Sequence, residues 1–595
     1  MFPSVIHLLF KTIETYADRV ALKSHFEGPV KQYTYRQFGE MIEHLMLGML
    51  KCGLKAGDRV AILSNNRPEW TITDFAVFAL RGIVVPIYPT LTGKQITYIL
   101  NDSETRAIFV EDKIQYDKIS QVRSGIPALE YIFSFSKILQ SNTETQTFNH
   151  LLEEGKTFVS DTGNAFVTSM EQILPEDVCS FVYTSGTTGE PKGVMLNHKG
   201  FVSDIINAEA VINLNHKDTF LSFLPLSHLY ERLGGHWCAF YRGATVHYAR
   251  SIDSVVDDIA IARPTIIVSV PRLYEKIMAA VLGQVESGTA VKRKIFYWAL
   301  ATGQKYFEQK HKGSISITLQ QKFSLANRLV FQKIKQKMGG RLRIPISGGA
   351  PLSPDTLKFF EAMDMPIIEG YGMTETHLII TLTPLGASRY GSCGKPIEGV
   401  MIKISDDGEI LVAGDTLMTG YYKKDELTRE IIDNDGWLHT GDIGFFDDDN
   451  FLFITDRKKN IIVTSGGKNI APAPIENEIK KSKYIEDLCL VGNGRKFISA
   501  LIMPNFEVLR KWAVDNGIPA SNDTELVNDY RSHKLFEDEV ERLQVEFANY
   551  EKVKKFHILA EPLSIDKDQL TPSLKIKRNV VEQHFAAEIN RMYDQ

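Results

Sequence analysis

A glycine- and hydroxyl-rich loop followed by a lysine has the residue types needed to hold an anion. It comes after an apolar, β-prone run at residues 178–183 and contains too much glycine to continue that strand. Glycine lets the backbone approach a bound group closely, hydroxyls add donors, and Lys192 adds a mobile positive charge. The loop residues are Thr184, Ser185, Gly186, Thr187, Thr188 and Gly189. This pattern suits a triphosphate or a departing pyrophosphate, although such a cluster alone is more often a polar surface turn.

Two later strand-to-turn junctions have residues suited to a purine nucleotide. Gly348, Gly349 and Ala350 have almost no side chain, so a flat base could lie against their backbone. Tyr371 offers a ring face on which adenine could stack. Glu375 offers the hard carboxylate oxygen that Mg²⁺ prefers beside phosphate. Taken singly, Tyr371 would more often be a core residue and Glu375 a surface residue.

Three single residues complete the candidate chemistry. Asp442 follows a predicted strand, where a carboxylate can accept both ribose hydroxyls, although a turn residue is the simpler reading. His228 ends another apolar strand of an α/β pattern, where ligands usually bind; in isolation it would be a hydrogen-bonded structural histidine. Lys575 lies on a polar loop near the C-terminus, where a lone lysine is usually just solvent-exposed.

The loop at residues 183–193, Tyr-Thr-Ser-Gly-Thr-Thr-Gly-Glu-Pro-Lys-Gly, closely resembles the phosphate-binding signature of the adenylate-forming enzymes. That superfamily comprises acyl-CoA synthetases, luciferases and the adenylation domains of peptide synthetases. The Gly-x-x-x-x-Gly-Lys-Ser/Thr nucleotide loop cannot be laid on these residues. Tyr-Gly-Met-Thr-Glu at 371–375 and Trp-Leu-His-Thr-Gly-Asp at 437–442 resemble the second and third signatures, so the resemblance extends over about residues 30–580.

The resemblance implies a role for each candidate. Nucleotide contacts fall to Gly348, Gly349, Ala350, Tyr371, Gly372, Thr374, Asp442 and Arg457, together with the phosphate loop and Lys192. Glu375, with Thr184, would hold Mg²⁺, and Lys575 would bridge the substrate carboxylate and the α-phosphate of ATP. His228 would line the acyl pocket, Lys459 would be the pivot of a mobile C-terminal domain, and Gly466 and Gly467 would lie beside the CoA pantetheine tunnel.

The chain departs from the superfamily pattern at two places. The family often has Gly-Arg-x-Asp-Asp at the domain junction, whereas this chain has Asp456 before Arg457 and Lys459 at the pivot. The glycine that usually precedes the mobile lysine is Leu574, which predicts a stiffer loop.

Three features resemble the long-chain fatty acyl-CoA synthetase branch: Pro271-Arg272 with its flanking helix, the insertion at 280–340, and Thr-Pro-Ser-Leu-Lys at 571–575. The resemblance implies a ligase that uses ATP to convert a fatty acid to an acyl-adenylate and then to acyl-CoA, releasing pyrophosphate and AMP. A fatty acyl-AMP ligase, an aryl or medium-chain acyl-CoA ligase, a luciferase-like oxygenase and a lipid- and ATP-binding scaffold are the alternatives. A peptide-synthetase adenylation unit would need a carrier domain downstream.

Composition describes a soluble globular protein of 595 residues, with 44% apolar and 24% charged residues. The net charge of −5 argues against a global affinity for nucleic acid or anionic membrane. The five scattered cysteines predict reduced core residues and no metal site, and the N-terminus lacks a secretory signal, so we expect a cytoplasmic protein. Peripheral membrane contact and a homodimer stay open. The basic helical stretch at 291–337 is predicted to be mainly a solvated face, with steering of CoA phosphates or binding of anionic lipid as alternatives.

Alternating strand and helix patterns predict a large α/β N-terminal domain with mixed and parallel sheets. We place it at residues 1–455, and we expect a small, mobile α+β C-terminal domain at 456–595 that bears Lys575. The segment 136–172 is polar and weakly patterned, which predicts a loop-rich approach to the phosphate loop. A chain of this length exceeds one ordinary hydrophobic core, in agreement with two domains.

Overall fold

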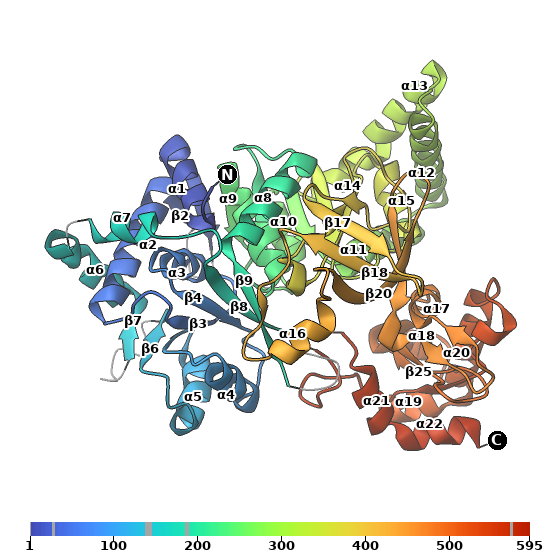
Figure 1. The fold of residues 1–595 in the computed structure, drawn as a ribbon. Helices are drawn as coiled ribbons and strands as arrows, with labels where there is room; N and C mark the ends of the chain where they lie inside the picture. Colours follow the sequence, from blue (N-terminus) through green and yellow to red (C-terminus); the bar gives the residue numbers. More distant parts are fainter. Residues whose placement is uncertain are drawn as a thin grey trace.

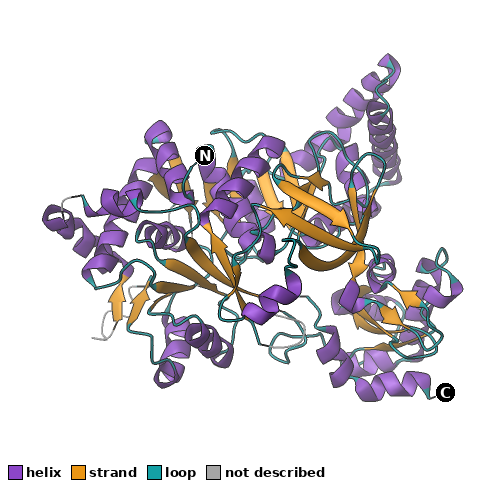
Figure 2. Cartoon of the chain, viewed as in Figure 1, coloured by secondary structure: helices purple, strands orange, loops and turns teal. Residues whose placement is uncertain are grey.

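The computed structural model describes residues 2–25, 30–136, 145–162, 164–184, 190–571 and 575–594. The predicted phosphate-loop residues Ser185, Gly186, Thr187, Thr188 and Gly189 lie outside these ranges. The described chain forms a large α/β body and a smaller α+β body at the C-terminus, which confirms the predicted fold class (Figures 1 and 2). Within the described ranges, no helix combines the length and the apolar character needed to traverse a bilayer.

The strand that leads into the phosphate loop, β8, lies in an eight-stranded sheet with the order β19-β9-β8-β4-β3-β5-β6-β7. The central pairs β4–β8, β3–β4 and β3–β5 are parallel, while β8 and β9 pair antiparallel. The helices α3, α4 and α5 connect the parallel strands, as the alternating pattern predicts, and α2 precedes β3. The bounds are α2 Tyr35–Lys51, β3 Arg59–Leu63, α3 Pro68–Ala79, β4 Ile83–Ile87, α4 Gly93–Asp102, β5 Ala107–Val110, α5 Lys113–Val122, β6 Tyr131–Ser134, β7 Thr145–Thr147, β8 Val178–Thr184, β9 Lys192–Asn197 and β19 Gly420–Tyr421.

A second sheet has nine strands in the order β16-β15-β14-β13-β12-β10-β11-β1-β2. Gly348 at the end of β13 pairs with Gly370 in β14, and this register brings the glycine turn at 348–350 next to Tyr371. The bounds are β1 Val20–Ser24, β2 Lys31–Thr34, β10 Thr219–Ser222, β11 Thr245–Tyr248, β12 Ile266–Ser269, β13 Ile344–Gly348, β14 Ile368–Tyr371, β15 Thr381–Leu382 and β16 Lys395–Pro396.

A third, antiparallel sheet has the order β17-β18-β20-β21 and leads the chain toward the small body. Its strands are β17 Val400–Ile404, β18 Glu409–Gly414, β20 Leu438–Phe446 and β21 Leu452–Arg457. The basic stretch predicted to be helical lies between the second-sheet strands β12 and β13. It forms α12 Ala290–His311, α13 Ile317–Ala326 and α14 Gln332–Lys337 after α11 Pro271–Glu286.

The small body has a three-stranded sheet, β24-β25-β26, covered by helices. The apolar core of the large body includes side chains as far along the chain as Ile454, and that of the small body begins at Ile462. The domain boundary near 456 stays a prediction that this separation supports. Strand β21, which ends at Arg457, pairs with β20, so Asp456 and Arg457 lie with the sheet of the large body. The main elements are β22 Ile462–Val463, β23 Asn469–Ile470, α17 Pro472–Ile479, β24 Ile485–Val491, β25 Ser499–Pro504, α18 Phe506–Asp515, α20 Tyr530–Leu543, β26 Lys555–Ile558, α21 Arg578–His584 and α22 Ala586–Tyr593.

The prediction of a loop-rich segment at 136–172 is wrong, because two helices, α6 Phe148–Thr162 and α7 Ala165–Glu171, occupy much of it. Helix α6 packs closely on α2 through glycine: a Cβ on Gly155 would lie 1.7 Å from the carbonyl oxygen of His44. The apolar side chains of Phe148 and Leu151 are buried as well, so tertiary packing stabilises a helix that its many polar residues concealed in the sequence. The first helix, α1 Val5–Tyr16, buries Ile6 and Leu9 against the domain.

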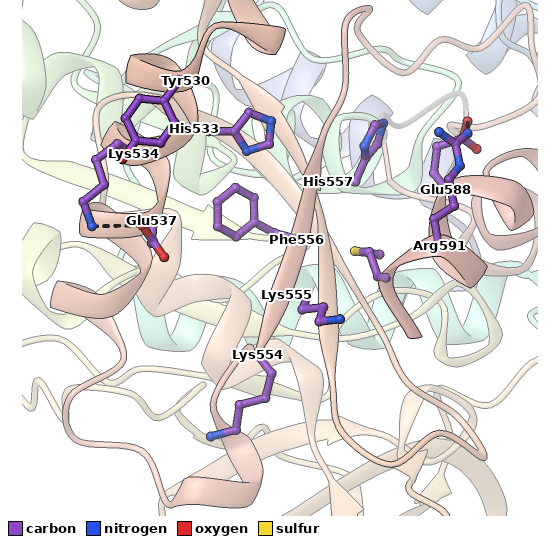
Figure 3. A pocket seen from close by; sticks show the side chains of 11 residues that line it. Tyr530, His533, Lys534, Glu537, Lys554, Lys555, Phe556, His557, Glu588 and Arg591 are labelled. Carbon is purple, nitrogen blue, oxygen red and sulfur yellow. Dashed lines mark hydrogen bonds and ion pairs between the residues drawn. The ribbon is translucent and has the colours of Figure 1, made fainter. Parts of the chain in front are cut away.

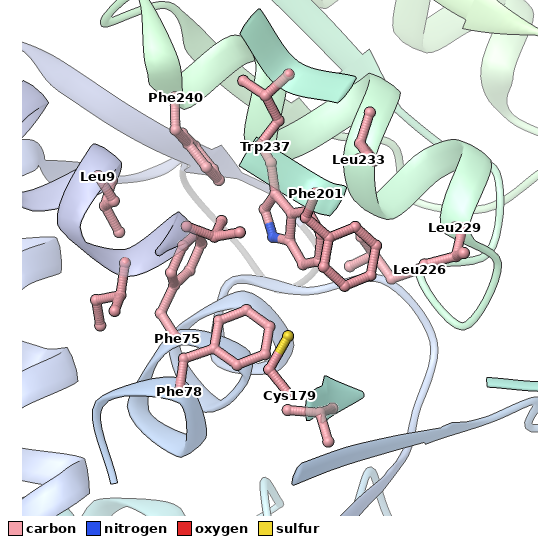
Figure 4. Packing of buried hydrophobic residues seen from close by; sticks show 14 of the residues in the cluster. Leu9, Phe75, Phe78, Cys179, Phe201, Leu226, Leu229, Leu233, Trp237 and Phe240 are labelled. Carbon is pink, nitrogen blue, oxygen red and sulfur yellow. The ribbon is translucent and has the colours of Figure 1, made fainter. Parts of the chain in front are cut away.

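A buried ion pair lies within the core between the two large sheets. The guanidinium of Arg232, in the π-helical segment η3 (Tyr230–Trp237), bonds both carboxylate oxygens of Asp74 in α3. The Arg232 guanidinium lies 4.8 Å from the ring centroid of Trp237. Trp237 belongs to the cluster of buried side chains shown in Figure 4. Because both charges are fully buried, removal of either one alone would leave an uncompensated charge and cost about 3–5 kcal/mol.

Glu231, the residue before Arg232, is also fully buried. We expect it to make the free energy of unfolding depend on pH. Burial raises the pKa of the Glu231 carboxyl from 4.5 to about 8. The folded state therefore holds a proton that the unfolded chain releases. The stabilisation is complete below the unfolded pKa of 4.5 and is lost as pH rises toward 8, by a few kcal/mol at most. Glu231→Gln, which cannot ionise, should melt at a temperature that falls less between pH 5 and pH 8 than that of the native protein.

Thermal melting followed by circular dichroism at several pH values tests this expectation. The exposed Glu546→Gln is the matched control and should keep the native pH dependence. Identical pH dependence in the native protein and Glu231→Gln would contradict the assignment.

Candidate active site

Tyr371, Asp442 and Arg457 come together from two sheets. The Tyr371 hydroxyl at the end of β14 donates to Oδ2 of Asp442 at 2.6 Å, and Arg457 Nε lies 3.0 Å from Oδ1. Asp442 was predicted to follow a strand, but it lies within β20, where it pairs with Arg457 of β21. Burial, followed by the charge of Asp442, raises the pKa of Tyr371 well above its usual range. The buried Asp442 carboxylate thus faces donors with both oxygens, which is the property a ribose diol requires.

A second group surrounds the start of β9. The ammonium of Lys192 lies 4.9 Å from the ring centroid of Tyr421, and the Tyr421 hydroxyl donates to Oε1 of Glu375 at 2.8 Å. Thr184, the last residue of β8, pairs with Lys192 across the β8–β9 ladder. Tyr421 reaches this position because β19 pairs with β9, where Tyr421 lies opposite Val194. The structure therefore brings Thr184, Lys192 and Glu375 to one place at the strand ends that flank the predicted phosphate loop in the sequence.

These residues fit a magnesium ion that is held mainly by a nucleotide. Within the described ranges, no three histidine, cysteine, aspartate or glutamate side chains gather as an all-protein metal cage. Mg²⁺ is commonly bound by one or two carboxylates together with substrate phosphates and water. Glu375 supplies such a carboxylate, and a single hydrogen bond from Tyr421 orients it without exhausting its acceptor sites.

Lys575 of the small body lies among groups of the large body. Its pKa is lowered, first because protein surrounds the ammonium and then by the charge of Arg457, while Asp442 acts in the opposite direction. The side chain is still open to solvent, so it is not sealed in the core. Lys575, Asp442 and Arg457 therefore share one electrostatic environment.

His228 also lies within the electrostatic influence of Lys575, and it is uncharged. Burial, and then the charge of Lys575, lowers its pKa to about 4. Its Nδ1 accepts the backbone N–H of Tyr230 at 3.1 Å, so the proton of the neutral ring is on Nε2. The sequence could not assign this tautomer, which leaves a neutral N–H donor at the strand end.

The small body holds the Lys575 loop by a buried ion pair. Arg578, three residues further on, bonds the Glu476 carboxylate of α17 and the Leu490 carbonyl of β24. At the junction, Asp456 accepts the backbone N–H of Ala473 in the first turn of α17 at 3.0 Å. The helix α17 thus connects the strand that leaves the large body with the loop that presents the lysine.

Two ion pairs hold the small body against the large one in this orientation. Arg272, at the start of α11, pairs with Glu486 of β24. Lys481 lies 3.2 Å from Asp355 of α15 (Pro354–Ala362). The predicted pivot Lys459 is exposed in the short segment between β21 and β22, and Gly466 and Gly467 lie on the exposed turn of the β22–β23 hairpin.

The glycine turns allow neighbouring protein groups to approach closely, and binding of a base against them stays a prediction. A Cβ on Gly348 would lie 3.0 Å from the Tyr230 ring, and Gly349 has a φ of +79°. A Cβ on Gly372 would lie 1.4 Å from the Leu378 carbonyl oxygen, so only glycine fits there. Ala350 is exposed next to this turn, and Thr374 begins the short 3₁₀ turn that carries Glu375.

Two residues near the site escaped the sequence reasoning. Glu369 of β14 is largely enclosed, and burial raises its pKa to about 8. His377, left without a role, is a structural histidine: Nδ1 donates to the Thr416 carbonyl at 2.7 Å and Nε2 accepts the backbone N–H of Asn197 at 3.0 Å. Burial lowers the His377 pKa to about 4, so it stays neutral and ties the end of β9 to the segment before Tyr421.

A separate cavity of about 400 Å³ lies in the small body between α20, β26 and α22 (Figure 3). It has several basic side chains, but carboxylates neutralise two of them. Lys534 lies 2.9 Å from Glu537, and Arg591 lies 2.9 Å from Glu588. None of the predicted site residues lines this cavity.

A two-body α/β protein whose small body presents a lysine to a nucleotide-type site on the large body has the architecture of a nucleotide-dependent acyl-activating enzyme. The AMP-binding enzyme family model matches residues 9–422, and the model of the AMP-binding enzyme C-terminal domain matches 459–595. The chain belongs to the AMP-binding enzyme family.

Relatives and solved structures agree with this membership over almost the whole chain. Long-chain-fatty-acid–CoA ligase FadD15 of Mycobacterium bovis is 32% identical over 99% of this chain and 97% of its own. Peroxisomal long chain acyl-CoA synthetase 7 of Arabidopsis thaliana is 33% identical over 98% of this chain and 85% of its own. The crystal structure of the anthranilate CoA ligase AuaEII with anthranoyl-AMP superposes with a TM-score of 0.74 at 21% identity, covering 99% of this chain and 98% of that chain, and supports the fold.

We expect the Tyr421 hydroxyl to matter for metal-dependent chemistry, because it fixes Glu375. Tyr421→Phe removes one hydrogen bond to a carboxylate, worth about 1.5 kcal/mol or roughly tenfold. ATP–pyrophosphate exchange should slow by that factor, and the magnesium titration should shift to higher concentration. Tyr422→Phe is the matched control, because its hydroxyl bonds Glu104 on the domain surface. An unchanged magnesium titration in Tyr421→Phe would refute the role.

Proposed function

We propose that this protein is an ATP-dependent long-chain fatty acid–CoA ligase. The position of the Lys575 ammonium, beside Asp442, Arg457 and His228 of the other body, carries the proposal. The names of the relatives above support the long-chain acid and CoA as substrates.

In the first step, a carboxylate oxygen of the acid attacks the α-phosphorus of ATP, the bond to the β-phosphate oxygen breaks, and pyrophosphate leaves. No protein nucleophile is needed, so the enzyme acts by positioning and charge stabilisation. Lys575 holds the carboxylate against the α-phosphate and neutralises the charge that gathers between them. Lys192 and the loop at 184–189 hold the departing pyrophosphate.

The nucleotide is held by groups that are already oriented. Asp442 accepts the ribose hydroxyls in place of its present donors, and Tyr371 offers its ring to adenine next to the turn at 348–350. A magnesium ion on Glu375 and Thr184 would reduce the negative charge of the phosphates. His228 presents its neutral N–H toward the proposed acyl pocket.

In the second step, the CoA sulfur attacks the acyl carbon, the bond to AMP breaks, and the thiol proton is lost. Lys575 occupies the side from which the sulfur must come, so the small body has to turn. We propose a turn about Lys459 that withdraws Lys575 and brings Gly466 and Gly467 to the thiol. The turn would break the Arg272–Glu486 and Lys481–Asp355 pairs.

Lys575→Ala tests this division of labour. Adenylate formation, measured by ATP–pyrophosphate exchange, should fall by about a hundredfold or more, because one charged contact to the transition state is lost. Thioester formation from supplied acyl-adenylate and CoA should survive. Lys577→Ala is the matched control, since that lysine pairs with Asp568 at 2.5 Å and not with the site.

Equal loss of both half-reactions in Lys575→Ala would refute the assignment. AMP release measured with acids from acetate to oleate, with and without CoA, tests the substrate. Activity that does not depend on CoA would identify a fatty acyl-AMP ligase instead.

A further inference from the structure

The helices α12 and α13 form an arm that projects from the large body (Figure 1). The arm holds its shape through aromatic packing, with the rings of Tyr306 and Phe323 stacked at 4.1 Å between centroids. It is anchored at Gly303, where a Cβ would lie 2.1 Å from the Ala362 carbonyl oxygen of α15. The arm is therefore a fixed part of the fold, and its outer surface needs its own explanation.

The arm and the helix that follows it are strongly basic. Residues 290–337 contain eleven lysines and arginines against the single acid Glu308, a net charge of +10 in a chain of net charge −5. Within the described ranges, Lys294, Lys305 and Lys322 have no carboxylate at ion-pair distance, unlike the paired cations of the small-body cavity. Charge of one sign, without internal partners, attracts a negatively charged surface.

Large apolar side chains lie exposed among these charges. Val291 is 67% exposed and Trp298 37% exposed on α12, while Ile317 is 77% exposed and Leu325 48% exposed on α13. Exposed apolar side chains occur elsewhere too, for example Val514 and Ile114, so the arm is distinguished by the excess of positive charge that surrounds its exposed apolar residues. Tryptophan and aliphatic side chains in water cost free energy unless another phase or partner covers them.

The helical spacing sorts these side chains onto an outer face. Val291, Lys294, Trp298 and Lys305 follow at intervals of three, four and seven residues, so they share one side of α12. Phe296, Ala299 and Phe307 are buried on the opposite side. An outer face of lysine with tryptophan and aliphatic residues is typical of helices that lie in a membrane interface.

We propose that the outer face of the α12–α13 arm docks the enzyme on an anionic lipid bilayer. The benefit of docking rests on the proposed function. A long-chain acid partitions into membranes, so the docked enzyme would meet its substrate there. Lysines of the arm provide the electrostatic attraction, and Val291, Trp298, Ile317 and Leu325 enter the interface. The negative remainder of the chain, at −15, faces away from the lipid charge.

Vesicle co-sedimentation of the full chain tests the proposal without requiring catalysis. The protein should bind vesicles of equal parts phosphatidylcholine and phosphatidylglycerol and bind pure phosphatidylcholine at least tenfold more weakly, with loss of binding at high salt. Lys294→Gln/Lys305→Gln should reduce binding to the anionic vesicles roughly tenfold. Trp298→Gln should reduce it as well, through lost insertion.

Lys511→Gln/Val514→Gln on the exposed face of α18 is the matched control, with one lysine and one apolar residue removed elsewhere, and it should bind as the native protein does. All variants should keep native activity on an acid short enough to dissolve in water. Absence of binding, equal binding to neutral vesicles, or equal loss in the α18 control would overturn the proposal. Vesicle binding by a protein without ligase activity would refute the proposed function and leave the docking surface standing.

Discussion

The proposed active site depends on one electrostatic interaction: the Lys575 ammonium of the small body lies among charged groups of the large body. The Lys575 ammonium stands beside Arg457, which repels it, and Asp442, which attracts it; Asp442 is buried, while Arg457 and Lys575 keep access to solvent. The lowered pKa of Lys575 indicates that this positive charge is incompletely compensated. A triphosphate would supply the missing negative charge at that point, so binding of the nucleotide and closure of the two bodies reinforce each other.

Strand pairing across long sequence separations orients the groups that face this charge. The pairing of β13 with β14 brings the glycine turn beside Tyr371, and the pairing of β20 with β21 brings Asp442 beside Arg457. The edge strand β19 does the same for Tyr421, which fixes Glu375. Hydrogen-bonded strand pairs therefore position each of these groups. The loops between the strands need to provide only hydrogen-bond donors and space for the ligand.

The site residues that belong to short sequence motifs were identified from the sequence. The residues whose role depends on contacts between distant parts of the chain were missed. Tyr371, Glu375 and Asp442 were found from short sequence patterns that resemble the family's signatures, and the structure joins Tyr371 and Asp442 by a hydrogen bond. The role of Tyr421 could not be read from the chain, because it arises only when β19 pairs with β9. Helix α6 was missed because polar residues dominate its composition, although Phe148 and Leu151 are buried at helical spacing and glycine contacts hold it against α2.

The carboxylate of Asp456 belongs to the last strand of the large body, yet it holds a backbone N–H in the first turn of α17 in the small body. Lys459 lies between these two partners along the chain. Any rotation of the small body about Lys459 must break this hydrogen bond. The free-energy cost is about 1 kcal/mol, comparable to the loss of a helix cap. The junction would therefore favour the observed domain orientation by a small free energy. The binding energy of a substrate is large enough to overcome this preference on every turnover.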